Sequence, residues 1–359
     1  MNKNAKIYVA GHRGLVGSAI VANLRQKGFT NIVTKMHQEV DLTNQIETAN
    51  FFEKEKPEYV FLAAAKVGGI LANNRYRADF IYENLMIQNN VIHQSYVHNV
   101  KKLLFLGSTC IYPKNANQPI KETELLTNEL EYTNEPYAIA KIAGIKMCES
   151  YNLQYNTNFL SVMPTNLYGP NDNFDLEKSH VLPALIRKIH LAKLLENNDE
   201  KSVLKDLQVD TLDEAKSILS KFGVTSKSVE IWGSGKPKRE FLWSEDMADA
   251  CVHIMQKVKF KDLISSPLWG DAEGRGDEIR NTHINIGTGI DISIAALAEK
   301  IKKIVGFNGD LHFDTSKPDG TLRKVTDVSK LHNLGWKHSV NLEEGIEKMY
   351  AWYLQKLNE

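Results

Sequence analysis

Short apolar runs alternate with longer amphipathic stretches through the first half of the chain. The short runs are rich in branched and aromatic residues and are followed by turn formers, which is typical of buried strands. We expect strands at 7–10, 31–35, 59–62, 103–107 and 159–163, with helices at 18–27, 45–56 and 78–98 and after Pro136. Strands and helices that alternate in this way predict an α/β fold with a doubly wound parallel sheet and right-handed crossovers.

The second half of the chain loses this strict alternation after Asn171. Its apolar residues follow the spacing of shorter strands and of amphipathic helices, which predicts a smaller C-terminal α/β domain. The expected strands are at 229–235 and 284–287, and the expected helices at 294–305 and 342–357.

Two segments of the second half carry no recognisable chemical motif. Residues 194–228 are charged and rich in lysine, with helical spacing at 212–222, which predicts a helical insertion at the surface. Residues 265–281 are rich in glycine and charge, which predicts a loop. We therefore divide the chain into a first domain at 1–170, to which some later segments return, and a second domain that takes up most of 171–359.

Three glycines lie between the first strand and the first helix. Gly11 supplies the tight turn, Gly14 lets backbone N–H groups approach a phosphate, and Gly17 permits close packing of the helix against the strand. The helix N-terminus then faces the negative charge. Strand, glycine loop and helix in this order predict a Rossmann-type dinucleotide-binding site.

The end of the second strand bears on which dinucleotide is bound. An NAD site places an acidic residue there to bond the ribose hydroxyls, whereas this chain has Lys35 and reaches Glu39 and Asp41 only later. Lys35, together with Arg13 of the glycine loop, suits a phosphate on the ribose. We therefore predict NADP(H) as the cofactor. The alternative is that Lys35 is a solvated surface charge.

The chemistry of the chain converges on Ser108 and on the helix that follows Pro136. Ser108 stands at the carboxyl end of the strand at 103–107, the edge at which open α/β sheets bind ligands. Tyr137 and Lys141 are one turn apart on one helical face, although such a pair alone is more often structural. An ammonium close to a phenol lowers the pKa of the phenol, and a serine hydroxyl shares the same substrate oxygen. The three residues predict a proton donor for a carbonyl that receives hydride.

Composition narrows the class of protein further. The chain has 359 residues, of which 42% are hydrophobic and 25% charged, as in an ordinary soluble globular protein. Lysine plus arginine equals aspartate plus glutamate at 44 each, so neither nucleic acid nor an anionic membrane is expected as a partner. Cys110, Cys148 and Cys251 are far apart, which disfavours a disulfide framework or a zinc site and favours a reducing cytoplasm. We expect no export signal, no membrane anchor and no metal.

Seven motifs, spread over nearly the whole chain, carry a family resemblance. They are Gly-His-Arg-Gly-Leu-Val-Gly-Ser at 11–18, Ala-Ala-Ala-Lys-Val-Gly-Gly-Ile at 63–70, Gly-Ser-Thr-Cys-Ile-Tyr-Pro at 107–113, Tyr-Ala-Ile-Ala-Lys at 137–141, Asn-Leu-Tyr-Gly-Pro at 166–170, His-Val-Leu-Pro-Ala-Leu at 180–185 and Trp-Gly-Ser-Gly-Lys-Pro-Lys-Arg-Glu-Phe-Leu at 232–242. With these motifs the chain resembles the extended short-chain dehydrogenase/reductase family. The Ser-Thr-Cys and His-Val segments narrow the resemblance to the epimerase-reductases that act on GDP-4-keto-6-deoxy-D-mannose.

The resemblance implies a reductase triad of Ser108, Tyr137 and Lys141, with Cys110 and His180 as the base and acid of an epimerisation. The chemistry is consistent, because a ketone at C4 acidifies the protons on C3 and C5, so that a thiolate and an imidazole can invert those centres through an enolate. Hydride from NADPH then reduces C4. The alternatives are that Cys110 is a small buried filler and that His180 is a surface loop residue.

The resemblance also implies two sets of binding residues, with stacking assigned to Trp232 and pyrophosphate binding to Arg239. The substrate set is Ser108, Val181, Leu185, Lys188, Trp232, Arg239 and Lys317. The cofactor set is Gly11, Arg13, Gly14, Leu15, Val16, Gly17, Lys35, Asp41, Leu42, Ala64, Ala65, Lys66, Tyr137, Lys141, Pro164, Asn166, Leu167 and His180.

The resemblance leaves the sugar open. The insertion and the loop at 265–281 exceed the shorter family members, so a related GDP-6-deoxy-4-keto-heptose, or epimerisation at one centre, is an alternative. A dehydratase or simple 4-epimerase shares the fold, but Thr109-Cys110 replaces the acidic pair of the dehydratases. A non-catalytic NADP-binding regulator is disfavoured because the Tyr/Lys pair is intact. The resemblance further implies a homodimer, with the helices that contain Asn84 and Lys141 as its interface.

Overall fold

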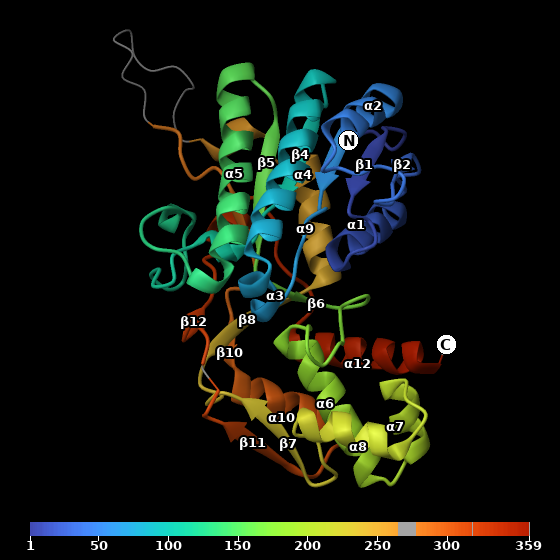
Figure 1. Ribbon diagram of the computed structural model, residues 1–359. Helices are drawn as coiled ribbons and strands as arrows, with labels where there is room; N and C mark the ends of the chain where they lie inside the picture. The colour runs from blue at the N-terminus through green and yellow to red at the C-terminus, as the bar shows by residue number, and fades with distance from the viewer. Residues whose placement is uncertain (265–277, 318, 359) are drawn as a thin grey trace. The chain divides into compact units, whose positions relative to one another are not determined.

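The computed structural model describes residues 1–264, 278–317 and 319–358, which form two compact units (Figure 1). The first unit comprises Met1–Leu167, Ser244–Gly289 and Thr326–Ser339. The second comprises Tyr168–Trp243, Ile290–Val325 and Val340–Glu359. After leaving the first unit at Leu167, the chain returns to it twice. The loop predicted at 265–281 lies outside the described residues except for 278–281.

Among the described residues, parallel strands form the central sheet of the first unit. The strand order is β2-β1-β3-β4-β5-β9, so the order reverses between β1 and β3. In open α/β sheets, ligands bind at the carboxyl ends of the strands beside such a switch point. This arrangement confirms the predicted α/β fold with a Rossmann-type parallel sheet. The strands are β1 (Ile7–Ala10), β2 (Ile32–Val33), β3 (Tyr59–Leu62), β4 (Lys102–Leu106), β5 (Phe159–Pro164) and β9 (Ile284–Ile286).

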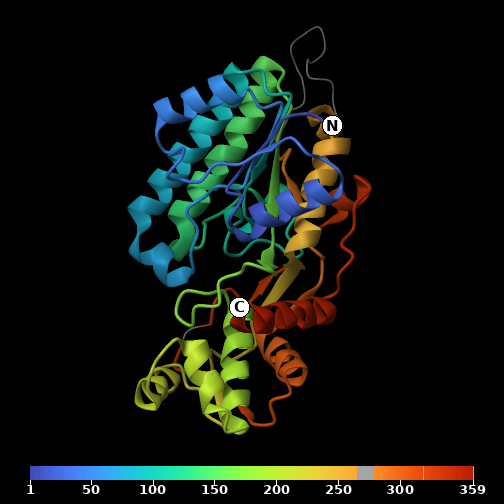
Figure 2. The same cartoon turned by 90° about the vertical axis from the view of Figure 1, so that its right-hand side faces the viewer.

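Helices cover both faces of this sheet (Figure 2). On one face α1 packs against α9, and on the other α4 lies between α2 and α5. None of the described helices is long and apolar enough to cross a membrane. The helices of this unit are α1 (Leu15–Gln26), α2 (Gln45–Glu55), α3 (Ile70–Arg75), α4 (Arg77–Val97), α5 (Glu135–Tyr155), α9 (Ser244–Lys257) and α11 (Ser329–Asn333), with short 3-10 turns at Thr109–Ile111, Glu122–Glu124, Tyr132–Asn134 and Phe260–Leu263.

The second unit has a separate apolar core. Leu185 of α6, Leu297 of α10 and Ile346 of α12 are buried in it together. β7 pairs in parallel with β11, while β8 pairs antiparallel with β10 and parallel with β12. The elements are α6 (Val181–Glu196), α7 (Glu200–Leu207), α8 (Leu212–Lys221), β7 (Ser228–Trp232), β8 (Lys238–Trp243), β10 (Asp291–Ser293), α10 (Ile294–Val305), β11 (Asp310–Asp314), β12 (Arg323–Lys324) and α12 (Leu342–Asn358), and β6 (Asn166–Tyr168) spans the boundary of the two units.

The insertion predicted at 194–228 contains a helix that the sequence did not predict. Besides the expected α8, the structure has α7, which Asp199 caps by accepting a hydrogen bond from the Ser202 backbone N–H (3.1 Å). Val203 and Leu207 bury the apolar side of α7. A helix of 8 residues with so few apolar positions gives too short a periodic signal to be recognised in the sequence.

Candidate active site

The segment that follows β4 turns sharply at the carboxyl edge of the sheet. A Cβ at Gly107 would lie 2.4 Å from the sulfur of Met163, so only glycine fits there without displacing that side chain. Ser108 then begins a 3-10 turn, and its Oγ accepts a hydrogen bond from the Cys110 backbone N–H (3.3 Å). Cys110 is buried, with 8% of its surface exposed. The turn therefore holds a hydroxyl and a thiol two residues apart at the ligand-binding edge of the sheet.

The start of α5 brings Tyr137 and Lys141 to the same edge. The Lys141 ammonium lies 5.7 Å from the centroid of the Tyr137 ring, as their one-turn spacing predicts. It donates a hydrogen bond to the carbonyl oxygen of Leu106, the last residue of β4 (2.8 Å). This bond ties the buried Lys141 to the strand that carries Ser108. The structure thus brings the predicted triad together from β4 and α5.

The ionisation of Tyr137 differs from the expectation drawn from its spacing to Lys141. Burial raises the pKa of the Tyr137 phenol, and negative charge on Cys110 adds to this effect. The expectation that Lys141 lowers the pKa of Tyr137 is wrong, because desolvation of the phenol outweighs the effect of an ammonium that is bonded to Leu106. Tyr137 is therefore a neutral phenol at ordinary pH, which is the form that a proton donor needs.

The charge of Lys141 sets the pH range of a reaction at this site. Burial lowers the pKa of Lys141 to about 8, so the side chain is charged below that pH and neutral above it. We expect the rate of carbonyl reduction to fall as the pH rises through about 8, since the ammonium then no longer stabilises the charge that Tyr137 acquires as it releases its proton. The pH profile of kcat/KM tests this, because it reports the pKa values of the free enzyme. In Lys141→Met the rate should be low throughout and show no fall in this range; a flat wild-type profile would contradict the expectation.

The glycine loop after β1 has the geometry that a dinucleotide requires. Gly11 has φ +82°, and a Cβ there would lie 2.6 Å from the backbone nitrogen of Ala64, at the end of β3. Gly14 precedes α1, whose first turn has no side-chain cap and no acidic residue. A pyrophosphate fits this helix start, because the first backbone N–H groups of a helix point outward and favour negative charge. Leu15 and Val16 follow in the same turn of α1.

Gly17 is the most restricted of the three glycines. An added Cβ would lie 2.1 Å from the Gly11 carbonyl oxygen, so the loop backbone must move. We expect Gly17→Ala to lower the free energy of unfolding by about 1–3 kcal/mol and to weaken dinucleotide binding. Urea unfolding and a fluorescence titration with NADPH measure the two effects. Gly14→Ala is the matched control for stability, because its Cβ would lie 3.6 Å from the same oxygen; equal destabilisation of both variants would contradict the account.

The residues predicted to select the cofactor lie after β2. The Lys35 ammonium is 3.3 Å from Oε1 of Glu39, whose Oε2 accepts a hydrogen bond from the Met36 backbone N–H (2.7 Å). Asp41 accepts from the backbone and hydroxyl of Thr43 (2.9 and 2.7 Å). Lys35 is therefore already paired with a carboxylate, which a ribose phosphate would have to displace.

Two amide side chains of α4 hold the loops of this edge, and the sequence did not identify their role. Asn84 accepts a hydrogen bond from the Lys66 backbone N–H (3.1 Å) and donates to the Lys66 carbonyl oxygen (3.0 Å). Asn90 donates to the carbonyl oxygens of Leu42 and Thr43 (2.9 and 3.2 Å). Both amides are buried. The available signal was the presence of these amides in a helix expected to pack against the sheet, since buried amides require partners.

The remaining cofactor candidates occupy the ends of β3 and β5. Ala64 and Ala65 follow β3, and the Ala64 backbone touches the glycine loop. Pro164 ends β5, and Asn166 and Leu167 follow it, with the Asn166 side chain exposed. All of these residues lie at the carboxyl edge of the sheet.

His180 and the helix that follows it belong to the second unit. His180 immediately precedes α6 and is exposed, Val181 is half-buried, and Leu185 is buried in the core. The Lys188 ammonium donates a hydrogen bond to the carbonyl oxygen of Glu230 in β7, and burial lowers the pKa of Lys188 to about 8. His180 and Cys110 belong to different units, so neither unit by itself pairs the two predicted epimerisation residues.

The second unit brings together the other predicted substrate residues. Trp232, at the end of β7, is 54% exposed, and the Lys317 ammonium lies 5.7 Å from the centroid of one of its rings. Arg239 of β8 donates to the carbonyl oxygen of Thr321 (2.5 Å), and burial lowers its pKa. A Cβ at Gly320 would lie 2.9 Å from an Arg239 nitrogen, so the Gly320 backbone lies close to the guanidinium. Two cations and an exposed aromatic face suit a nucleoside diphosphate.

A parallel sheet with a glycine loop after β1 and a Ser/Tyr/Lys group at the carboxyl end of β4 defines an oxidoreductase that binds a nicotinamide dinucleotide. The chain belongs to the NAD dependent epimerase/dehydratase family, whose pattern matches residues 7–264. It is therefore a nicotinamide-dependent enzyme, and the family resemblance inferred from the sequence is confirmed.

Similar proteins match this chain over nearly its whole length. GDP-L-fucose synthase 1 of Arabidopsis thaliana is 51% identical over 356 residues, which cover 99% of this chain and 95% of the relative. The solved structure of a GDP-6-OMe-4-keto-L-xylo-heptose reductase from C. jejuni is 54% identical, covers 99% of both chains and has a TM-score of 0.92. MlghC, a GDP-mannoheptose C4 reductase from Campylobacter jejuni with NADP bound, is 53% identical, with 99% of both chains covered and a TM-score of 0.88.

Proposed function

We propose that this enzyme epimerises GDP-4-keto-6-deoxy-D-mannose at C3 and C5 and reduces it at C4 with NADPH, giving GDP-L-fucose. The observation that carries the proposal is the buried turn after β4, in which Cys110 follows two residues behind Ser108 and lies beside the Tyr137/Lys141 pair. A reductase needs the serine, tyrosine and lysine, whereas a thiol at this position adds a base for carbon acids. The similarity to a GDP-L-fucose synthase along the chain supports the same assignment.

Reduction depends on proton donation by Tyr137. When bound, the reduced nicotinamide supplies the hydride. The neutral Tyr137 phenol donates its proton to the C4 oxygen, and the Ser108 hydroxyl donates a hydrogen bond to the same oxygen. The Lys141 ammonium, held by the Leu106 carbonyl, stabilises the phenolate that forms. These roles explain why the three side chains converge on one edge of the sheet.

Epimerisation assigns the base to Cys110 and the acid to His180. Electrostatic attraction between the Cys110 thiolate and the Lys141 ammonium opposes the effect of burial on Lys141, and the same attraction favours the thiolate. The thiolate removes the proton from C3 or C5, Tyr137 and Ser108 stabilise the enolate oxygen, and His180 returns a proton on the opposite face.

NADPH is the proposed cofactor, with Lys35 and Arg13 on the ribose phosphate. The exposed Arg13 side chain and the position of Lys35 after β2 support this choice, as does the NADP bound to MlghC. The GDP moiety is assigned to Trp232 for stacking and to Arg239 and Lys317 for the pyrophosphate, which is the set that the second unit brings together.

A second candidate is reduction of a GDP-6-deoxy-4-keto-heptose. The solved GDP-heptose reductases that are 54% and 53% identical to this chain over 99% of its length support the candidate. The Ser108, Tyr137 and Lys141 roles are the same for both sugars, because both carry at C4 the carbonyl that receives hydride.

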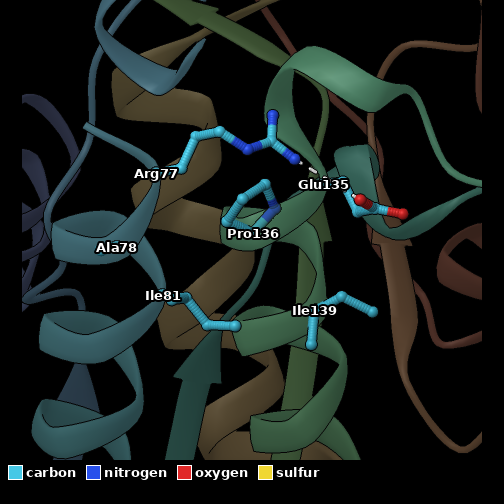
Figure 3. Close-up of a pocket in the computed structure, with 6 residues that line it drawn as sticks. All are labelled: Arg77, Ala78, Ile81, Glu135, Pro136 and Ile139. Atoms are coloured by element: carbon cyan, nitrogen blue, oxygen red, sulfur yellow. Dashed lines mark ion pairs between the residues drawn. The ribbon is translucent and has the colours of Figure 1, made fainter. Parts of the chain in front are cut away.

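The homodimer is proposed to form through the outer faces of α4 and α5. These two helices expose Tyr82, Ile139 and Leu153 by 62%, 41% and 42%, and apolar side chains that gather on one surface mark interaction sites. Figure 3 shows Ile81 and Ile139 on the two sides of a hollow of about 330 Å³ between the helices. A second copy would cover these residues, and a monomeric mass in light scattering would count against the dimer.

The free thiols of all three cysteines support the cytoplasm as the compartment.

The test is turnover of NADPH in deuterated water, with separate reactions on GDP-4-keto-6-deoxy-mannose and on the corresponding heptose. Deuterium at both C3 and C5 of a product reduced at C4, detected by NMR on the hexose, is the expected result. Faster turnover of the heptose would replace the first candidate by the second. Reduction of either sugar without deuterium would remove the epimerase role.

A further inference from the structure

Asp206 of α7 lies at the centre of a buried polar network in the second unit. Its side chain has no exposed surface. Arg187 of α6 binds it twice, because Nε donates to Oδ1 (2.8 Å) and Nη2 donates to the Asp206 carbonyl oxygen (2.7 Å). The other carboxylate oxygen accepts a hydrogen bond from the Tyr353 hydroxyl of α12. A buried ion pair whose polar groups are satisfied is rigid, and this pair joins the insertion to α6 and α12.

The same network holds the loop that precedes His180. The third nitrogen of Arg187, Nη1, donates to the Phe174 carbonyl oxygen (3.2 Å). The Phe174 ring stacks on Tyr353, with centroids 4.4 Å apart and planes at 23°. Arg187 and Tyr353 are both bonded to the carboxylate of Asp206. The Asp206 carboxylate therefore holds two residues that contact Phe174. Arg187 bonds to the Phe174 backbone, and Tyr353 stacks on the Phe174 ring.

Hydrogen bonds within the loop connect Phe174 to His180. The Asp175 side chain accepts from the Glu177 backbone N–H (2.9 Å), and the Asp175 carbonyl oxygen accepts from the Ser179 backbone N–H (3.0 Å). His180 comes next and ends the loop at the start of α6. This short segment is therefore bonded to itself between Phe174 and His180.

The insertion makes a further contact with the loop through α8. The Lys221 ammonium lies 3.5 Å from the Glu177 carboxylate, and both side chains are exposed. An exposed pair of this kind contributes little to stability. The buried contacts of Asp206 therefore carry the restraint.

We propose that Asp206 and Arg187 are positioning residues for His180, and that the insertion at 194–228 serves this purpose through Asp206. The inference rests on the proposed function, in which His180 is the acid of the epimerisation. Reduction at C4 uses Tyr137 and needs no proton from His180. Loss of the network should therefore slow epimerisation much more than reduction. The rate of proton transfer falls steeply when the acid is misplaced by about 1 Å.

Asp206→Asn tests the proposal, because it keeps the size of the side chain and removes its charge. In deuterated water with NADPH and the 4-keto sugar, we expect deuterium incorporation at C3 and C5 to fall by about tenfold or more relative to reduction at C4. Hydrogen exchange of residues 171–180 should accelerate while that of α6 is unchanged. Tyr353→Phe, which removes one hydroxyl and keeps the ring, is the milder second variant and should shift both readouts in the same direction.

Lys193→Ala is the matched control, because Lys193 lies on α6 but pairs with Glu196 (2.9 Å) outside the network. It should leave both readouts at the wild-type values. An unchanged ratio of exchange to reduction in a folded variant, or an equal loss of both activities, would overturn the proposal. If the wild type incorporates no deuterium, the proposed epimerisation fails. Unchanged protection of residues 171–180 in Asp206→Asn would separately show that the network does not hold the loop.

Discussion

Tyr137→Phe is expected to lower the rate of C4 reduction by about 10²–10⁴-fold, the usual contribution of a positioned proton donor. The variant removes one hydroxyl from a ring that packs edge-on against Phe80, with centroids 6.4 Å apart, so the fold should persist. Burial raises the pKa of Tyr137, which keeps the phenol protonated and makes it the donor at this edge of the sheet. Single-turnover oxidation of NADPH measures the rate, and a fluorescence titration checks that NADPH still binds.

Tyr151→Phe is the matched control for this prediction. Tyr151 lies on the same helix, and its hydroxyl is bonded to Nδ1 of His93 (2.8 Å) rather than to the candidate site. Its rate should equal that of the wild type. Retention of most of the rate in Tyr137→Phe would mean that another group donates the proton, and the assignment of the reductase triad would fail.

Cys110→Ser is expected to suppress deuterium incorporation at C3 and C5 by about 10²-fold or more, because a serine hydroxyl is a far weaker base than a thiolate. Cys110 is buried and lies in the turn that Ser108 begins, so replacing sulfur by oxygen changes the volume little. Tyr137 and Lys141 are untouched, and reduction at C4 should continue. NMR of the product formed in deuterated water reports both activities in one sample.

Cys148→Ser is the control for the loss of a buried thiol. Burial raises the pKa of Cys148 to about 12, so this thiol is no base at neutral pH. Its replacement should leave the ratio of deuterium incorporation to reduction unchanged. If Cys110→Ser keeps the wild-type ratio, Cys110 is a core residue and the base lies elsewhere.

The parts of the candidate site whose geometry agrees with the sequence-based expectation are those in which the spacing is local. Gly11 and Gly17 lie six residues apart on either side of one turn, and the close approach expected of them is present. Tyr137 and Lys141 meet because a helix repeats every 3.6 residues. The strand before Ser108 was recognisable because a short, fully apolar run reads as a buried parallel strand.

The parts that the sequence did not predict depend on contacts between distant segments. Asn84 and Lys66 are 18 residues apart, and Arg187 and Asp206 are 19 apart, and no periodic pattern relates such positions. The helix that carries Asp206 is too short and too charged to be recognised before its apolar side is packed against the core.

By itself, the sequence determined the class of fold and predicted the dinucleotide loop, because both are encoded in neighbouring residues, and it supplied candidates for the reacting groups. Only the tertiary structure decided how those groups are charged. It places the half-buried Tyr137 side chain beside the buried Lys141 ammonium, and desolvation raises the pKa of the first and lowers that of the second to about 8. Burial is a property of the packed chain, since desolvation depends on every segment that excludes water from a group and not on the residues beside it in the sequence.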